Sequence, residues 1–209
     1  MNNGLQTSQI PATETIKPKI LYYGTPVILL TTVNEDETTN ISPLSSSWAL
    51  GDCIVLGVGV AGKAFENLQR HPECVINVPD PSLWERVERL APYTGKNPVP
   101  EEKKQIGFSY RKDKFAVAGL TPVPGMAGKP ARIGECPLQL EATVKNVRIP
   151  EHTLNFAIVE TKVMQVHAHR NITLDEHHID PGKWSPILYN FRHYFGLGEQ
   201  LGRTFRSEV

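Results

Sequence analysis

Three consecutive hydroxyls are the side chains of this sequence best placed to do chemistry. Ser45, Ser46 and Ser47 stand before an apolar run, and after that run Gly62 and Lys63 open a predicted helix. Hydroxyls, backbone N–H groups at a helix N-terminus and one ammonium are the groups that a bound phosphate needs. Because successive residues of a strand face opposite sides, at most two of the three serines can point at one ligand. The pattern predicts a site for a phosphate or a planar ring; the alternative is a polar edge strand beside a solvated lysine.

The elements that must position these side chains are mostly strands. The residue pattern predicts strands over 26–33, 40–50, 53–60, 73–78, 137–149 and 154–169, and helices over 63–70, 83–90 and 101–106. Gly57 and Gly59 leave one face of the third strand clear for a ligand or another backbone. Because the strands follow one another without alternating with helices, the pattern favours a mainly β fold, an antiparallel barrel with appended short helices.

The chain is expected to form one domain with additions at both ends and in the middle. Residues 1–17 are polar and predict a flexible N-terminal arm, whereas residues 18–209 fit a single domain. Within that domain, a segment of about 82–130, rich in Pro, Gly and Lys, is interpreted as an insertion of short helices and loops. Residues from about 177 to 209 form an aromatic-rich C-terminal tail.

The composition narrows the classes of partner. Lys plus Arg number 22, as do Asp plus Glu, so the net charge of zero argues against nucleic acid as a partner. A near-neutral charge is also compatible with self-association. We find no apolar signal core and no apolar stretch long enough to span a membrane, and therefore expect a cytoplasmic protein without a membrane partner.

Metal and disulfide chemistry have little support in the sequence. Cys53, Cys74 and Cys136 lack C-x-x-C spacing, and the first two open apolar runs, which predicts buried small hydrophobes. His167 and His169 stand two apart on a predicted strand, but no neighbouring Cys or carboxylate completes a ligand set. We therefore predict exposed strand-edge histidines and no metal site.

A short basic cluster formed by Arg111, Lys112 and Lys114 lies in the insertion. It is interpreted as solvated; the alternative is that it attracts the 2′-phosphate of NADPH or another anion. No G-x-G-x-x-G follows a strand and opens a helix, so a nicotinamide nucleotide would not be held on a Rossmann unit. No G-x-S-x-G elbow supports a hydrolase triad.

Several short motifs, in order, resemble one known family. They are T-T-V-N-E-D-E-T-T-N-I-S-P-L-S-S-S, then an apolar strand, G-K-A-F-E-N-L and E-C-V-I-N-V-P, and in the tail P-I-L-Y-N-F-R-H-Y-F-G-L-G. This series resembles the flavin reductase-like proteins with an FMN-binding split barrel, which include the flavoredoxin-like proteins. The resemblance covers roughly residues 20–80 and returns in the tail.

The resemblance implies a homodimer of antiparallel split barrels with FMN, rather than FAD, near the subunit boundary. By position, it implies that the isoalloxazine and ribityl groups are lined by Asn40, Ser45, Ser46, Ser47 and Trp48. It assigns the ribityl and phosphate end to Val60, Ala61, Gly62, Lys63 and Asn67. The tail motif adds Arg192 and Tyr194, which would close the pocket from the same or the partner subunit. The family often has K-D-T where this chain has Lys63-Ala64-Phe65, so one phosphate-binding hydroxyl is missing.

The function implied is that of an FMN-binding oxidoreductase, an NAD(P)H:flavin reductase. NADH or NADPH would give a hydride to flavin N5, and the reduced flavin would leave or pass electrons to an oxygenase or another acceptor. The flavin carries this chemistry, so no catalytic acid or base is assigned. Two alternatives stay open: an FMN-containing electron carrier that works with a partner protein, and a split-barrel relative that has lost flavin and acts as a scaffold.

Overall fold

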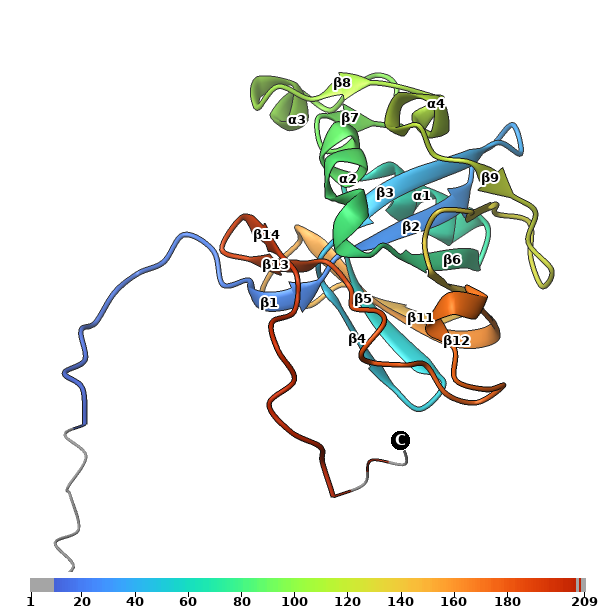
Figure 1. The fold of residues 1–209 in the computed structure, drawn as a ribbon. Coiled ribbons are helices and arrows are strands. Elements are labelled where there is room, and N and C mark those ends of the chain that lie inside the picture. Colours follow the sequence, from blue (N-terminus) through green and yellow to red (C-terminus); the bar gives the residue numbers. More distant parts are fainter. Residues whose placement is uncertain (1–9, 206, 208–209) are drawn as a thin grey trace, which may run out of the picture.

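The computed structural model of the chain describes residues 10–205 and 207 (Figure 1). Its described part folds around an antiparallel sheet of seven strands in the order β3-β2-β6-β11-β12-β5-β4. These strands are β2 (Ile28–Val33), β3 (Thr39–Leu44), β4 (Ser47–Leu50), β5 (Cys53–Gly59), β6 (Glu73–Val78), β11 (Leu138–Arg148) and β12 (Phe156–Ala168). Helix α1 (Lys63–Arg70) connects β5 to β6. The mainly β fold predicted from the sequence is confirmed.

The sheet curls into a split barrel. Strands β3 and β4 follow each other in the chain but occupy the two opposite edges of the sheet, and Ser45 and Ser46 carry the chain across. At the crossing, the Gly57 N–H donates a 2.7 Å hydrogen bond to the Ser46 carbonyl oxygen. A Cβ on Gly57 would lie only 2.8 Å from Ser46 Cβ, so a glycine is needed for this close approach. The prediction of one strand over 40–50 is therefore wrong, because the chain changes edge in its middle.

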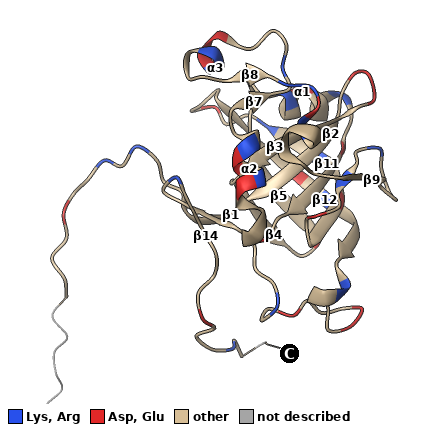
Figure 2. Cartoon of the chain, turned by 45° about the horizontal axis from the view of Figure 1, so that its top comes forward, with Lys and Arg blue, Asp and Glu red and all other residues tan. Residues whose placement is uncertain are grey.

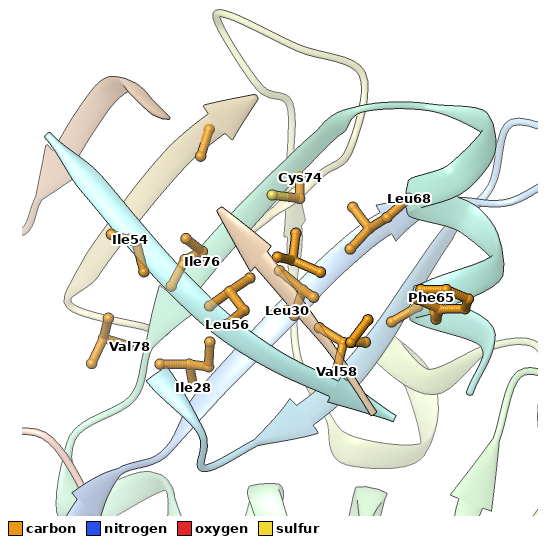
Figure 3. Packing of buried hydrophobic residues seen from close by; sticks show 14 residues of the cluster. Ile28, Leu30, Ile54, Leu56, Val58, Phe65, Leu68, Cys74, Ile76 and Val78 are labelled. Carbon is orange, nitrogen blue, oxygen red and sulfur yellow. The ribbon is translucent and has the colours of Figure 1, made fainter. Parts of the chain in front are cut away.

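The apolar core fills the inside of the curled sheet. Figure 3 shows side chains of β2, β5 and β6 pointing toward one another, among them Leu30, Leu56 and Ile76. Phe65 and Leu68 of α1 pack against the same cluster. The periodicity of two along each strand puts these side chains on one face, and their burial stabilises the sheet by about 25 cal/mol per Å² of apolar area.

Strand β2 is buried on both faces. Ile28 and Leu30 face the barrel core, whereas Leu29 belongs to a second apolar cluster that includes Val87 and Leu90. The second cluster is covered by the segment between β6 and β11, hereafter called the insertion. Its elements are η1 (Pro81–Leu83), α2 (Trp84–Leu90), β7 (Tyr93–Thr94), α3 (Glu101–Gln105), β8 (Ser109–Tyr110), α4 (Lys114–Ala118), β9 (Pro122–Val123) and β10 (Arg132–Ile133). Figure 1 shows α2, α3 and α4 grouped beside the β2–β3 edge of the barrel.

The C-terminal part returns to the start of the described chain. After η2 (Arg170–Ile172), β13 (Leu188–Asn190) and β14 (His193–Phe195) form a hairpin, and β13 also pairs with β1 (Tyr23–Pro26). Residues 10–19 are exposed and lie in no helix or strand. The flexible arm predicted for 1–17 falls in part on residues 1–9, which lie outside the described residues.

Charged side chains of both signs are interspersed along the chain, and α2 carries both (Figure 2). This distribution agrees with the zero net charge of the sequence. Among the residues described, no helix has the length and apolar character needed to cross a membrane.

Candidate functional site

A cavity of about 390 Å³ lies where the open edge of the barrel meets the insertion. Its walls come from the end of β3, the turn between β5 and α1, the insertion and the C-terminal hairpin. The volume is within the range of small-molecule sites, roughly 300–1,000 Å³. Segments far apart in the sequence therefore converge on one pocket.

Four of the residues predicted for the site line this cavity, namely Ser45, Gly62, Lys63 and Tyr194. Ser45 lies at the crossing between β3 and β4, and Lys63 is the first residue of α1. Tyr194 comes from β14, so the tail reaches the pocket of its own chain. The structure thus brings the serine-bearing crossing and the lysine-bearing turn to the same pocket.

Two further predicted residues, Asn40 and Asn67, are buried and do not line the cavity themselves. The Asn40 amide donates a 3.1 Å hydrogen bond to Ser42 Oγ, and Ser42 lines the cavity. The Asn67 amide donates to Thr32 Oγ1 at 3.0 Å and Asn34 Oδ1 at 2.9 Å. Asn40 therefore orients a residue of the pocket, whereas Asn67 joins α1 to β2 and the turn after it.

The remaining predicted residues do not line this cavity. Ser46 Oγ donates a 3.1 Å hydrogen bond to the Tyr22 hydroxyl, and Trp48 is 58% exposed on the edge strand β4. Arg192 stands exposed at the β13–β14 turn with a φ of +69°. Ser47, at the start of β4, and Val60 and Ala61, in the turn before α1, are also absent from the wall.

The charge of Lys63 is compensated within the protein. Its Nζ donates to both carboxylate oxygens of Glu35, at 2.7 and 2.8 Å, and to Glu66 Oε1 at 2.6 Å. Burial lowers the pKa of Lys63, but the hydrogen bonds to the two carboxylates outweigh it, so the pKa is raised above its usual value. The hydrogen bond from Lys63 in turn lowers the pKa of Glu35 to about 2. Lys63 therefore offers an anion much less attraction than an unpaired lysine would.

Aromatic side chains form much of the wall, and sequence reasoning did not assign them. Tyr22, Tyr93, Phe108 and Tyr189 line the cavity together with Tyr194. Tyr189 contacts Tyr22 edge-on at 5.4 Å between ring centroids and Tyr194 at 5.8 Å. A wall of ring faces and edges suits a planar aromatic ligand. No spacing rule links these residues, because they come from four separate segments.

Two lysines of the insertion, Lys103 and Lys114, also line the cavity. Lys114 is 2% exposed, and its Nζ donates a 2.8 Å hydrogen bond to the Ile41 carbonyl oxygen. Burial, helped by the positive charge of Lys103, lowers the pKa of Lys114 to about 7. Burial, followed by the charge of Lys96, also lowers the pKa of Lys103. The pocket therefore contains two desolvated amines.

Of the basic cluster predicted to be solvated, Arg111 and Lys112 are exposed, whereas Lys114 is buried. Arg111 lies over the Tyr93 ring at 5.5 Å, and Lys112 forms an ion pair with Asp36. Lys114 is buried at the start of α4, and Asp113 before it caps the helix by accepting a hydrogen bond from the Ala116 N–H.

The prediction that His167 and His169 are exposed is wrong, because both are half-buried, His167 on β12 and His169 directly after it. His167 Nε2 lies 2.7 Å from Glu141 Oε1, and His169 Nε2 lies 3.0 Å from the Gly134 carbonyl oxygen. Cys74 and Cys136 are buried as small hydrophobes, whereas Cys53 is half-buried. Within residues 10–205 and 207, His, Cys, Asp and Glu side chains form no group of three or more that could hold a metal ion.

The curled antiparallel sheet, whose consecutive strands β3 and β4 lie at opposite edges, defines a split-barrel protein, and the cavity described above lies beside the end of β3. Residues 20–198 match the family model described as "Flavin reductase like domain", so the chain belongs to this family. The family predicted from the short motifs is confirmed.

Individual proteins are similar to this chain in sequence or in fold. The chain is 63% identical over 194 residues to "Uncharacterized protein YdfE" of Bacillus subtilis (strain 168), covering 93% of this chain and 94% of that protein. Its fold is similar to that of the flavoredoxin of Desulfovibrio vulgaris (Miyazaki F), with a TM-score of 0.77, 22% identity, and coverage of 94% of this chain and 99% of the other. It is also similar to nitrilotriacetate monooxygenase component B from Bacillus cereus, with a TM-score of 0.72, 18% identity, and coverage of 93% and 100%.

Proposed function

We propose that this protein is an FMN-binding oxidoreductase, an NAD(P)H:flavin reductase that supplies reduced flavin or electrons to an acceptor. The observation that carries the proposal is the convergence of Ser45, Gly62, Lys63 and Tyr194 on one aromatic-walled cavity. Membership of the flavin reductase-like family supports a flavin as the ligand. We take this flavin to be FMN rather than FAD, as the resemblance implies, and the cavity of about 390 Å³ lies within the size range of small-molecule sites.

The residues present fit FMN in polarity and shape. Hydroxyls of Ser42 and Ser45 give the β3 end of the pocket hydrogen-bonding capacity, and tyrosine rings give it flat apolar walls. Gly95 lines the cavity at a position where no side chain fits, because a Cβ there would clash with Asn40 Oδ1. Bound FMN would accept a hydride from NADH or NADPH and pass the electrons on.

The chain's own residues would hold and orient the ligand and shield the cavity from water. Asn40 fixes the Ser42 hydroxyl by its 3.1 Å hydrogen bond. Asn67, in the middle of α1, ties the helix to β2 and so supports the Gly62–Lys63 turn from which the helix begins. Tyr194 and the other rings exclude water from one side of the cavity. Positioning and exclusion of water are the contributions that a protein makes to cofactor chemistry.

The wider expectations from the resemblance are part of the same proposal. We propose a homodimer, in which exposed residues off the cavity, such as Trp48 and Arg192, lie near the subunit boundary. We propose an oxygenase component or another electron acceptor as the partner. The similarity in fold to nitrilotriacetate monooxygenase component B from Bacillus cereus supports this choice. The cytoplasmic location stays a prediction of the sequence.

The test is a visible absorption spectrum of the purified protein before and after addition of micromolar FMN, followed by rapid mixing with NADH or NADPH. We expect a perturbed flavin spectrum and rapid bleaching by one nicotinamide nucleotide. A bound flavin that bleaches slowly with both would favour the electron carrier instead. An FMN spectrum that is identical with and without protein would contradict the proposal.

A further inference from the structure

Lys114 is a buried ammonium without an acid partner. Among the described residues, no carboxylate lies within ion-pair distance of it, and its described hydrogen-bond acceptor is the Ile41 carbonyl oxygen. An ammonium has three N–H donors, so two remain for a ligand. Burying a charge that is not paired costs stability, and such residues are retained mainly at functional sites.

A second lysine, Lys103, lines the same pocket. Lys103 Nζ lies 3.7 Å from the position that a Cβ on Gly62 would occupy, so it stands at the turn that opens α1. Its nearest described aromatic contact is the Phe108 ring, 5.7 Å from Nζ to centroid. The positive charge of Lys103 acts on Lys114 strongly enough to contribute to its lowered pKa. Two like charges thus face one cavity without a carboxylate between them among the described residues.

Lys63, the cation expected from the sequence, is a weaker anchor. Glu35 and Glu66 both accept hydrogen bonds from its ammonium, and Lys96 lies 3.5 Å from Glu66 as well. Among the described residues, an anion entering the pocket would therefore meet the lysine N–H donors that are not paired with a carboxylate on the insertion, not on α1.

We infer that Lys114, assisted by Lys103, binds a phosphate monoester of the nucleotide that occupies the cavity. The inference rests on the proposed function and adds the residues that distinguish phosphorylated from unphosphorylated ligands. A phosphate monoester carries close to two negative charges near neutral pH and accepts several hydrogen bonds, which matches two lysine side chains that line one cavity. Two ligands offer this chemistry: FMN through its terminal phosphate, and NADPH through its 2′-phosphate.

The experiment compares matched ligands that differ by one phosphate. Affinities for FMN and riboflavin are measured by fluorescence titration, and those for NADPH and NADH by calorimetry, on wild type and Lys114→Met. Lys112→Gln is the control, because Lys112 is exposed, pairs with Asp36 and does not line the cavity. Lys103→Met tests the assisting residue.

If FMN is the source, Lys114→Met weakens FMN binding by about tenfold or more and leaves riboflavin within about twofold. If NADPH is the source, the substitution leaves the affinities for FMN and riboflavin unchanged and removes a preference for NADPH over NADH. Either result supports the inference, and Lys112→Gln should match wild type in all four titrations. Lys103→Met should reproduce the selective loss to a smaller degree.

The inference is overturned if Lys114→Met preserves both the FMN-to-riboflavin and the NADPH-to-NADH affinity ratios of wild type. Failure of the proposed function looks different, because wild type would then bind neither flavin. In that case millimolar inorganic phosphate is the probe: a rise in melting temperature for wild type that Lys114→Met lacks supports the phosphate site, and no rise in either overturns it.

Discussion

The hydroxyl of Tyr194 donates a 2.9 Å hydrogen bond to Glu88 Oε2, which joins β14 to α2 along one wall of the cavity. Burial, followed by this contact with Glu88, raises the pKa of Tyr194 above its usual value, so the phenol stays a neutral donor. The C-terminal hairpin and the insertion are thereby held together around the pocket.

Two substitutions at Tyr194 separate this hydrogen bond from the ring. Tyr194→Phe removes only the bond to Glu88, and we expect a loss of about 0.5–1.5 kcal/mol in unfolding free energy with little change in FMN affinity. Tyr194→Leu also removes the ring and should weaken FMN binding by about twofold to tenfold. Urea unfolding and FMN titration check the pair; equal FMN affinities in all three proteins would show that the ring does not contact the ligand.

Gly95 is predicted to tolerate no side chain. A Cβ there would clash with Asn40 Oδ1 and lie 3.2 Å from Lys63 Cγ. We expect Gly95→Ala to lower the unfolding free energy by about 1–3 kcal/mol and to weaken FMN binding, because Asn40 would shift with Ser42. Gly198→Ala is the control, since nothing lies within 4 Å of the position that a Cβ on Gly198 would occupy. Similar melting temperatures for both variants would refute the steric argument.

The buried lysine predicts an unusual dependence of stability on pH. The pKa of Lys114 is about 7 in the folded chain, against 10.5 as its ordinary value, so between these values the unfolded state binds more protons. Stability therefore rises with pH across this window by up to about 1.4 kcal/mol per unit from this group. Lys114→Met should be more stable than wild type at pH 7, and the gap should narrow toward pH 9. A gap independent of pH in urea unfolding would contradict the assignment.

Glu141 is expected to stabilise the loop between β9 and β10. Its buried carboxylate accepts hydrogen bonds from the N–H groups of Met126, Ala127 and Gly128 and contacts His167. Burial raises the pKa of Glu141, but these contacts lower it more, so the net pKa is below its usual value.

This low pKa means that the contribution of Glu141 is present above the unfolded pKa of about 4.3 and is lost as pH falls through the folded pKa. Glu141→Gln should cost about 1–3 kcal/mol at pH 7 and progressively less in acid. The exposed Glu151→Gln is the matched control, and thermal melts at pH 7 and pH 4 provide the comparison. A Glu141→Gln melt that matches wild type at pH 7 would contradict this account of the loop.

The sequence predicts the barrel strands well where local pattern and burial agree. Alternation over 137–149 and 154–169 identifies β11 and β12, because one face of each strand must be apolar. It fails at Ser45 and Ser46, because the change of sheet edge depends on the curl of the whole sheet and on the close approach at Gly57. No local signal contains that information.

The site was predictable on the barrel side and not on the insertion side. Ser45 and Lys63 lie on elements with recognisable order and spacing, and both reach the pocket. Lys103 and Lys114 sit on helices of five residues within an irregular segment, and only tertiary packing determines which lysine turns inward. Asn67, a motif residue, does not line the cavity, and its hydrogen bond to Thr32 joins α1 to β2.

The most direct measurement is a crystal structure of the protein with FMN bound. We predict the flavin inside the cavity, with its ring among the tyrosines near Ser45 and its phosphate within hydrogen-bond distance of Lys114 or Lys103. Flavin density on an outer face, such as that around Trp48, with the cavity between β3 and the insertion left empty, would contradict the account.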